Sequence, residues 1–125
     1  MIEVYLKPIV LAAETGDLST VVHLLQDPSV DPSVTGNLAI KLAAENGYTQ
    51  IVECLLKDRR VDPSTWWNYP IKFAAKNGHI NVVKLLLSDP RVDPNASDGL
   101  AIKWATNYGY PQIVNLLKRR KRKRV

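Results

Sequence analysis

Residues 38–57, LAIKLAAENGYTQIVECLLK, decide the fold because they encode two short helices separated by one glycine. In the first half, Ile40, Ala43 and Ala44 fall at i, i+3 and i+4, which places them on one face of a helix. Gly47 then stands where a helix commonly ends in a left-handed residue. The first half therefore predicts a helix whose small alanines allow a neighbouring helix to approach closely.

The second half predicts another helix over residues 49–57, with Val52, Leu55 and Leu56 as its buried stripe. Neither helix is long enough to be stable alone, because isolated helices need about 12–15 residues even in favourable sequences. Each pair exposes an apolar face that only another pair can cover. We therefore expect the chain to fold by stacking such pairs.

The same pattern recurs in steps of 31 residues, which indicates a repeat architecture. The recurring positions are Gly16, Gly47, Gly78 and Gly109; Ala12, Ala43, Ala74 and Ala105; Ile9, Ile40, Ile71 and Ile102; Val21, Val52, Val83 and Val114; and Leu24, Leu55, Leu86 and Leu117. An Asp-Pro pair also recurs and predicts an extended connection, since the residue before proline is biased away from helical angles. The predicted units are residues 1–30, 31–61, 62–92 and 93–117.

Two substitutions distinguish the fourth unit from the others. Lys118 stands where the earlier units have leucine, and Thr106 stands where they have alanine. Terminal units of a stacked array need a polar outer face. We therefore expect an all-α solenoid of four stacked helix-turn-helix repeats, complete in itself, with the terminal two units as caps.

These residues resemble the ankyrin repeat. The segments Leu42–Gly47 and Asn77–Leu87 look like the heart of that motif, and the resemblance covers essentially the whole chain. The trailing Asp89–Pro94 is similar to a variant seen in ankyrin arrays of large DNA viruses and some unicellular eukaryotes. The resemblance implies an ankyrin-type solenoid with short finger loops that binds other proteins.

The chain departs from the family at two points. The family's Thr-Pro-Leu-His opening reads Leu38–Lys41, Tyr69–Lys72 and Leu100–Lys103, so the hydrogen bonds of that threonine and histidine are expected to be absent or replaced. The step is also two residues shorter than the usual 33. We place the loss in the fingers, which the resemblance puts at Val34–Asn37, Thr65–Asn68 and Ala96–Gly99.

Proteins similar to this chain bind partners through the fingers and the exposed side of the first helices. Carried over residue by residue, that surface predicts a partner-binding site made of Trp66, Trp67, Tyr69, Phe73, Lys76, Trp104 and Tyr108. A tryptophan pair does not help a turn, which favours Gly, Asn, Asp and Ser, and tryptophan is enriched among residues that carry binding energy. The alternative is that one indole packs on Phe73, Trp104 or an adjacent finger and only adds to the core.

Two columns of equivalent residues also allow either a structural or a partner-binding interpretation. Leu11, Leu42, Phe73 and Trp104 form a column of increasing size, for which core packing is the simpler interpretation and partner contact the other. Lys41, Lys72 and Lys103 form a lysine column. We expect a solvated or locally paired row, and the alternative is that it steers an acidic partner.

Positive charge is concentrated at the C-terminal end. The chain has 17 basic and 12 acidic residues, a net charge of +5, and seven of the basic residues form the tail, residues 118–125: Lys118, Arg119, Arg120, Lys121, Arg122, Lys123 and Arg124. We expect helix to about Arg120 and disorder beyond. The tail is typical of a nuclear-import signal or a non-specific nucleic-acid contact, and the alternative is a solubilising cap.

No residues form an arrangement typical of catalysis or metal binding. Cys54 aligns with His23, Leu85 and Leu116 and is interpreted as a packing residue, while His79 looks like a helix-entry residue. One cysteine and two separated histidines match no metal spacing, so we expect no enzyme, metal or cofactor. No apolar run approaches the roughly 18 residues that span a bilayer. We expect an intracellular monomer, cytoplasmic or nuclear, that binds another protein.

Overall fold

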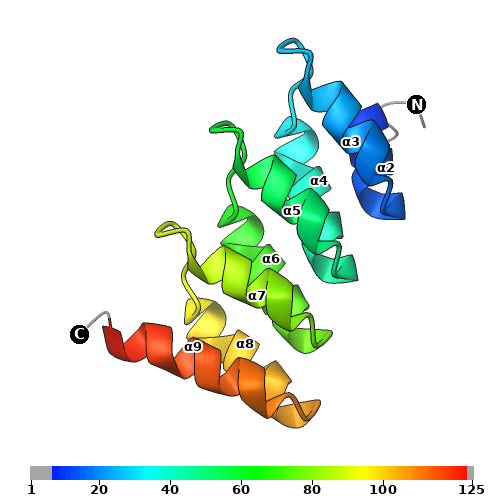
Figure 1. Cartoon of the computed structure of the whole chain (residues 1–125). Helices are drawn as coiled ribbons and strands as arrows, with labels where there is room; N and C mark the ends of the chain where they lie inside the picture. The colour runs from blue at the N-terminus through cyan, green and yellow to red at the C-terminus, as the bar shows by residue number, and fades with distance from the viewer. Residues whose placement is uncertain (1–6, 124–125) are drawn as a thin grey trace.

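Each repeat folds into a pair of helices joined by a tight turn, and the pairs stack along one direction (Figure 1). The structure is a computed structural model that describes residues 7–123, with side chains as far as Arg120. Its helices are α2 (Pro8–Thr15), α3 (Leu18–Leu25), α4 (Val34–Asn46), α5 (Thr49–Leu56), α6 (Thr65–Lys76), α7 (Ile80–Leu87), α8 (Ala96–Asn107) and α9 (Pro111–Lys123). The predicted all-α stack of four helix pairs is confirmed.

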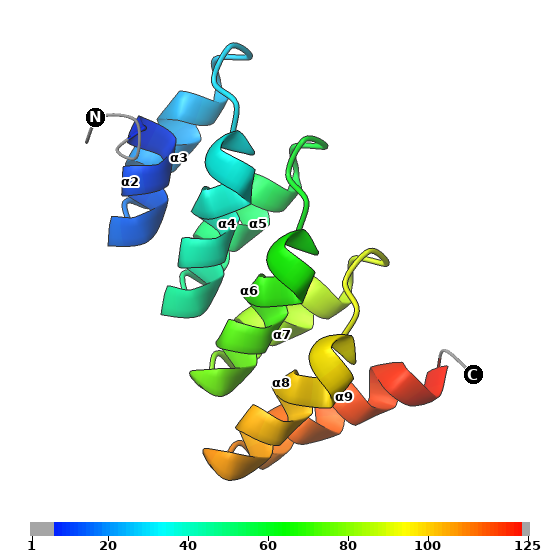
Figure 2. The ribbon, with the colours of Figure 1, turned by 180° about the vertical axis from the view of Figure 1, so that it is seen from behind.

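The helices form two layers, which the front and back views show in turn (Figures 1 and 2). The first helices α2, α4, α6 and α8 contact one another in sequence order, and so do the second helices α3, α5, α7 and α9. The core lies between the layers. The alanine pairs of α4 and α6 have no exposed surface, and neither do Leu55 and Leu86 of the second layer. The small and branched residues of the repeat thus lie where stacking requires them.

The turn inside each pair depends on its glycine. Gly47 has a φ of +80°, a left-handed conformation that glycine adopts without steric cost. The ring of His79, from the next unit, lies directly over it: a Cβ at Gly47 would come within 2.5 Å of His79 Nδ1. Tyr48 covers Gly16 and Tyr110 covers Gly78 in the same way. Gly16, Gly47 and Gly78 therefore each follow a first helix and leave room for a ring from the following unit.

The fingers lie in a place that differs from the prediction. The predicted finger positions form the first residues of α4, α6 and α8, where three consecutive residues adopt left-handed angles. These left-handed turns are Thr35–Asn37, Trp66–Asn68 and Ser97–Gly99. The segments that project from the stack are instead the connecting loops before them, residues 26–33, 57–64 and 88–95 (Figure 2).

An asparagine in the left-handed turn makes a hydrogen bond to the next unit. Asn68 Oδ1 accepts a hydrogen bond from the Asp93 backbone N–H at 2.8 Å, and Asn37 Oδ1 accepts one from Asp62 N–H at 2.8 Å. Asn68 is only 8% exposed. Asparagine tolerates left-handed angles better than most residues, so one residue type serves both the turn and the contact with the next unit.

An arginine joins each connecting loop to the loop or helix of the next unit. Arg60 Nη2 donates to the Val30 carbonyl at 2.9 Å, and Arg91 Nη1 donates to the Val61 carbonyl at 3.1 Å. Both arginines are fixed by an aspartate two residues earlier, at 2.8 Å. These contacts tie neighbouring loops together along the side of the stack.

The last helix is longer than predicted. α9 runs for 13 residues to Lys123, whereas α3, α5 and α7 each have 8 residues. The expectation of helix only to about Arg120 is therefore wrong. Cations at the C-terminal end of a helix interact favourably with its dipole, and this opposes the repulsion between like charges. Lys118 and Thr106 are exposed, as expected for a polar outer face.

Candidate functional site

Aromatic and lysine side chains from three successive first helices form one connected surface. Its members are Lys41 of α4; Trp66, Tyr69, Phe73 and Lys76 of α6; and Trp104 of α8. We call this set the aromatic–lysine surface. Four of its members are aromatic, and the two lysines each lie over two of the rings.

Stacked rings form the centre of the surface. Tyr69 and Phe73 are four residues apart on α6, and their ring centroids are 3.9 Å apart at an interplanar angle of 17°. Trp104 meets Phe73 edge-on, with the centroids 5.1 Å apart. Offset and edge-to-face pairs of this kind contribute about 0.5–1.5 kcal/mol beyond the area that they bury. The half-buried column position at Phe73 and Trp104 therefore joins two units while leaving ring area exposed.

Lys41 is held over the rings of the next unit. Its Nζ lies 3.7 Å from the centroid of Trp66 and 4.6 Å from that of Tyr69, and the residue is only 9% exposed. Burial lowers the pKa of the Lys41 ammonium, an effect that the nearby Glu45 carboxylate opposes. The lysine column is thus not a solvated row at this position. The indole and phenol rings replace water around the charge, as in other cation–π contacts.

The other lysines near the surface have different surroundings. Lys76 Nζ lies 5.0 Å from the Trp104 centroid and 5.5 Å from that of Phe73. Lys72 Nζ donates to Ser97 Oγ at 2.9 Å, and Lys103 is exposed. Of these three lysines of α6 and α8, Lys76 therefore lies over the aromatic centre, while Lys72 contacts the turn of α8.

The two tryptophans of the left-handed turn differ in their environment. Trp66 packs back on the preceding unit: its Nε1 donates to the Gly36 carbonyl at 3.2 Å. It nevertheless remains 54% exposed, while Trp67 is 78% exposed. Within residues 7–120, no hydrogen bond or ring contact holds Trp67. One indole therefore packs on the adjacent predicted finger, at Gly36, and on Lys41, but not on Phe73 or Trp104, whereas the Trp67 indole makes no such contact.

Tyr108 is the remaining predicted site residue. It lies four residues after Trp104, on the same side of the helix end, and is 56% exposed. The structure thus brings Tyr69, Phe73, Lys76 and Trp104 into contact and joins Trp66 to them through Lys41, whereas Trp67 and Tyr108 make no such contact. Sequence reasoning missed Lys41 as a member, although its place in the lysine column next to the only unit with a tryptophan pair was an available signal.

The phenol of Tyr69 is expected to titrate late. Burial, together with the 2.7 Å hydrogen bond from its hydroxyl to Glu45 Oε1, raises its pKa to about 12. Because the folded-state pKa lies above the unfolded value of about 10, this group's contribution to stability is complete below pH 10 and is lost as the pH rises towards 12. An absorbance titration should show one late phenolate step, which Tyr69→Phe removes. A titration without a late step contradicts this assignment.

Arg120 takes part in the fold, unlike the residues before it in the tail. It donates to the carbonyls of Leu87 and Val92, the latter at 3.3 Å. Val92 is the equivalent of Val30 and Val61, so a helical arginine makes the contact that loop arginines make elsewhere. Lys118 and Arg119 are exposed. The side chains of Lys121, Arg122 and Lys123 and all of Arg124 lie outside the described part of the chain.

Removal of Arg120 alone should destabilise the array. We expect Arg120→Ala to lower the free energy of unfolding by about 1.5–3 kcal/mol, as is typical for hydrogen bonds that involve a charged group. The double variant Lys118→Ala/Arg119→Ala should change it by less than about 0.5 kcal/mol, because both residues are exposed. Urea denaturation measures both, and equal losses in the two variants would refute the structural role of Arg120.

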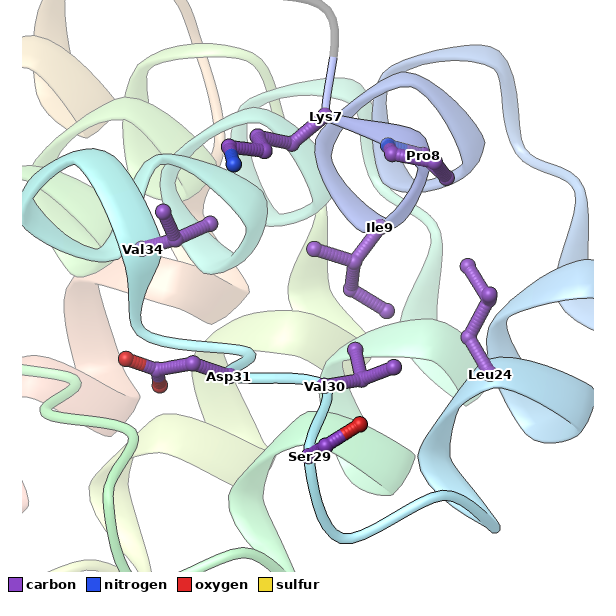
Figure 3. Close-up of a pocket in the computed structure, with 8 residues that line it drawn as sticks. All are labelled: Lys7, Pro8, Ile9, Leu24, Ser29, Val30, Asp31 and Val34. Carbon is purple, nitrogen blue, oxygen red and sulfur yellow. The ribbon is translucent and has the colours of Figure 1, made fainter. Parts of the chain in front are cut away.

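A pocket of about 240 Å³ lies at the first unit, between α2, α3 and the loop before α4 (Figure 3). Ile9, Leu24 and Val30 line it together with Lys7 and Asp31. The equivalents of these three apolar residues in the second unit have no exposed surface. The pocket therefore lies where the described part of the stack ends. We do not place the functional site there.

The described residues offer little to other kinds of chemistry. No group of three metal-ligating side chains occurs among residues 7–120. No helix in the described chain is long and apolar enough to cross a membrane. His79 precedes α7 as its N-cap residue, and its Nε2 donates to the Glu45 carbonyl at 3.0 Å. Cys54 is half-buried against the core. Both residues thus have the structural positions that the sequence predicted.

The fold and the surface together define a helical repeat protein with a lateral aromatic face. The family described as ankyrin repeats (3 copies) matches residues 9–98. The chain belongs to the ankyrin repeat family. Ankyrin repeats generally mediate protein–protein interactions and are typically non-catalytic. No curated protein matches the chain.

Proposed function

We propose that the chain is a protein-binding scaffold whose partner covers the aromatic–lysine surface together with Trp67 and Tyr108. The exposed indole of Trp67 carries the proposal. Trp67 has a φ of +54°, which does not suit a tryptophan, and it is 78% exposed, so its ring does not contribute to the core. Residues in strained conformations often cluster at binding sites.

The equivalent turns show that the fold does not need a tryptophan pair. The second position of the turn is Gly36 in the unit before and Asp98 in the unit after, and both adopt the same left-handed angles as Trp67. Left-handed angles cost an ordinary residue roughly 1–2 kcal/mol. A partner that buries the Trp67 ring would gain the large contact area that makes tryptophan common among residues with high binding energy.

Affinity capture with matched variants tests the proposal. Three baits are exposed to the same cell extract at moderate salt: the native chain, Trp67→Gly and Asp98→Gly. Trp67→Gly introduces the residue found in the preceding unit, and Asp98→Gly makes the same backbone change one unit further along. We expect a protein that the native and Asp98→Gly baits retain and Trp67→Gly loses. If all three baits retain the same proteins, the proposal is wrong.

Loss of binding in Trp67→Gly should accompany a gain in stability. We expect the free energy of unfolding to rise by about 0.5–1 kcal/mol, since relief of left-handed strain exceeds the extra freedom of glycine in the unfolded chain. Trp67→Ala is the control, because alanine keeps a Cβ and should give no gain. Thermal and urea denaturation measure the change, and a destabilised Trp67→Gly would show that the indole is structural.

A second candidate function lies in the basic tail, and the helical extension of α9 favours it. α9 continues to Lys123, and Lys118 and Arg119 are exposed on it, so the charges project from the stack on a helix. Such a segment suits contact with nucleic acid or nuclear-import machinery and a cytoplasmic or nuclear location. With Arg120 committed to the fold, six cations remain, and contact of all six with duplex phosphates predicts a log–log salt slope of about −5.

Charge reversal tests the second candidate better than truncation, because a chain ending at Leu117 also loses the contacts of Arg120. Lys118→Glu/Arg119→Glu leaves them in place. If this variant loses duplex DNA that the native chain retains, the tail is a nucleic-acid contact. Equal retention by both chains, or a slope near −2 or weaker, argues against it.

A further inference from the structure

We infer that the aromatic–lysine surface recognises an acidic peptide segment that carries one large apolar side chain. The inference rests on the proposed function and specifies the partner's chemistry. It follows from the charges around the rings, from the groups that already occupy the ring faces, and from the one indole that remains free.

Positive charge without a carboxylate partner gathers on one side of the surface. α6 carries Lys72 and Lys76 and no acidic residue, and α8 adds Lys103. The ion pairs of Arg60 and Arg91 are with their own loop aspartates, and none joins Lys72, Lys76 or Lys103 to a carboxylate of the described residues. Lys72 donates to a neutral serine, and Lys76 lies over rings. These three ammonium groups are therefore available to carboxylates of a partner.

The acidic residues nearby do not neutralise this charge. The Glu45 carboxylate accepts the Tyr69 hydroxyl and lies near Lys41, which is in the preceding unit. Its backbone carbonyl accepts Asn77 Nδ2 at 2.9 Å and the ring of His79, so the residue is held in place. Asp98 is exposed in the turn of α8, next to the serine that Lys72 contacts. With Lys72, Lys76 and Lys103 set against Asp98, α6 and α8 keep an excess of two positive charges.

The ring faces favour a peptide over a single-stranded nucleic acid. Non-specific strand binding needs several aromatic faces for successive bases and a continuous row of free cations. Here Tyr69 stacks on Phe73, Trp104 meets Phe73 edge-on, and the lysines lie over both pairs. Of the three indoles, only that of Trp67 makes no hydrogen bond, ring contact or cation–π contact with another described residue. One free indole near the start of α6, with Lys72 and Lys76 further along that helix and Lys103 on α8, matches one apolar anchor accompanied by carboxylates.

Selection from a peptide library tests the inference without a known partner. The native chain is immobilised, and random peptides displayed on phage are selected at low salt. We expect the enriched peptides to be rich in Asp and Glu around one aromatic or leucine residue. A synthetic peptide of the enriched sequence is then titrated against the free chain. Tryptophan emission reports binding directly, because all three tryptophans, Trp66, Trp67 and Trp104, lie at or beside the surface.

Matched variants separate the apolar and the charged parts of recognition. Trp67→Gly should weaken binding of the peptide at least about 10-fold, and Asp98→Gly should not weaken binding. Lys103→Glu should weaken it about 3–10-fold at low salt, with a smaller effect at high salt. Lys84→Glu is the charge control: it makes the same change of net charge on exposed α7, in the other layer, and should leave binding unchanged.

The outcomes distinguish failure of this inference from failure of the proposed function. If the enriched peptides require Trp67 but are neutral or basic, the inference of an acidic partner is wrong. The proposal that this surface binds a protein then still stands. If no enriched peptide depends on Trp67, both proposals fail. A fluorescent oligo(dT) strand serves as the competing probe. Binding of that strand to the surface, abolished by Trp67→Gly while no peptide is selected, would assign the surface to nucleic acid instead.

Discussion

Gly47→Ala is expected to lower the free energy of unfolding by about 2–5 kcal/mol, from backbone strain of roughly 1–2 kcal/mol and overpacking of roughly 1–3 kcal/mol. The backbone term arises because Gly47 has a φ of +80°. The packing term arises because the new Cβ would meet the His79 ring at 2.5–2.8 Å. The ring cannot move aside freely, since its Nε2 donates to the Glu45 carbonyl. Of a typical stability of about 5–15 kcal/mol, this loss is a large fraction.

Gly109→Ala is the matched control for this loss. Gly109 has a φ of +82°, almost the same as Gly47, but a Cβ there would meet nothing within 4 Å. It should therefore lose only the backbone term, about 1–2 kcal/mol. Urea denaturation of the two variants isolates the contribution of the stacked ring by subtraction. Equal losses at Gly47 and Gly109 would mean that the ring column contributes nothing to stacking.

Asn68→Ala is expected to lower the free energy of unfolding by about 2–3 kcal/mol. The substitution removes the acceptor of the Asp93 backbone N–H, which lies between two units, and loss of a buried partner costs about 1–3 kcal/mol. It also places a residue less tolerant of left-handed angles at a φ of +63°. Both effects act at the junction of the third and fourth units.

Two further substitutions at Asn68 separate these effects in denaturant titrations. Asn68→Gly suits the backbone, as Gly99 does at the equivalent position, and loses only the hydrogen bond. Asn68→Asp keeps an acceptor oxygen and should lose less than about 1 kcal/mol. If Asn68→Asp is as damaging as Asn68→Ala, the side chain does not act through this hydrogen bond.

Repetition in the sequence is enough to predict the helix pairs, because a residue that recurs every 31 positions must face the same neighbour in every unit. Gly47 and Leu55 are such residues, and each has the structural role that its pattern indicates. The left-handed turns are harder to predict. Trp66 and Trp67 are poor left-handed residues, so local preference gave no reason to expect three such residues in a row.

Contacts between units that break the repeat could not be predicted either. Lys41 meets Trp66 only because one unit has a tryptophan where its neighbours have threonine and serine. Arg120 does not share a repeat position with Arg60 and Arg91, and its contact with Val92 depends on how far α9 extends. The candidate site was therefore predictable as a set of residues on a face, whereas its internal cation–π contacts required the three-dimensional structure.

The arginine contacts point in one direction along the chain, which has a consequence for synthesis. Arg60 binds the loop at Val30, Arg91 binds the loop at Val61, and Arg120 binds the loop at Val92, so each loop is completed by residues made about 30 positions later. A ribosome adds roughly 5–20 residues per second. A nascent unit therefore waits a few seconds with its loop carbonyls in water until the next unit emerges. Chaperones that recognise unfinished repeats would meet this chain one open loop at a time, and the last such loop closes only after Arg120 has left the exit tunnel.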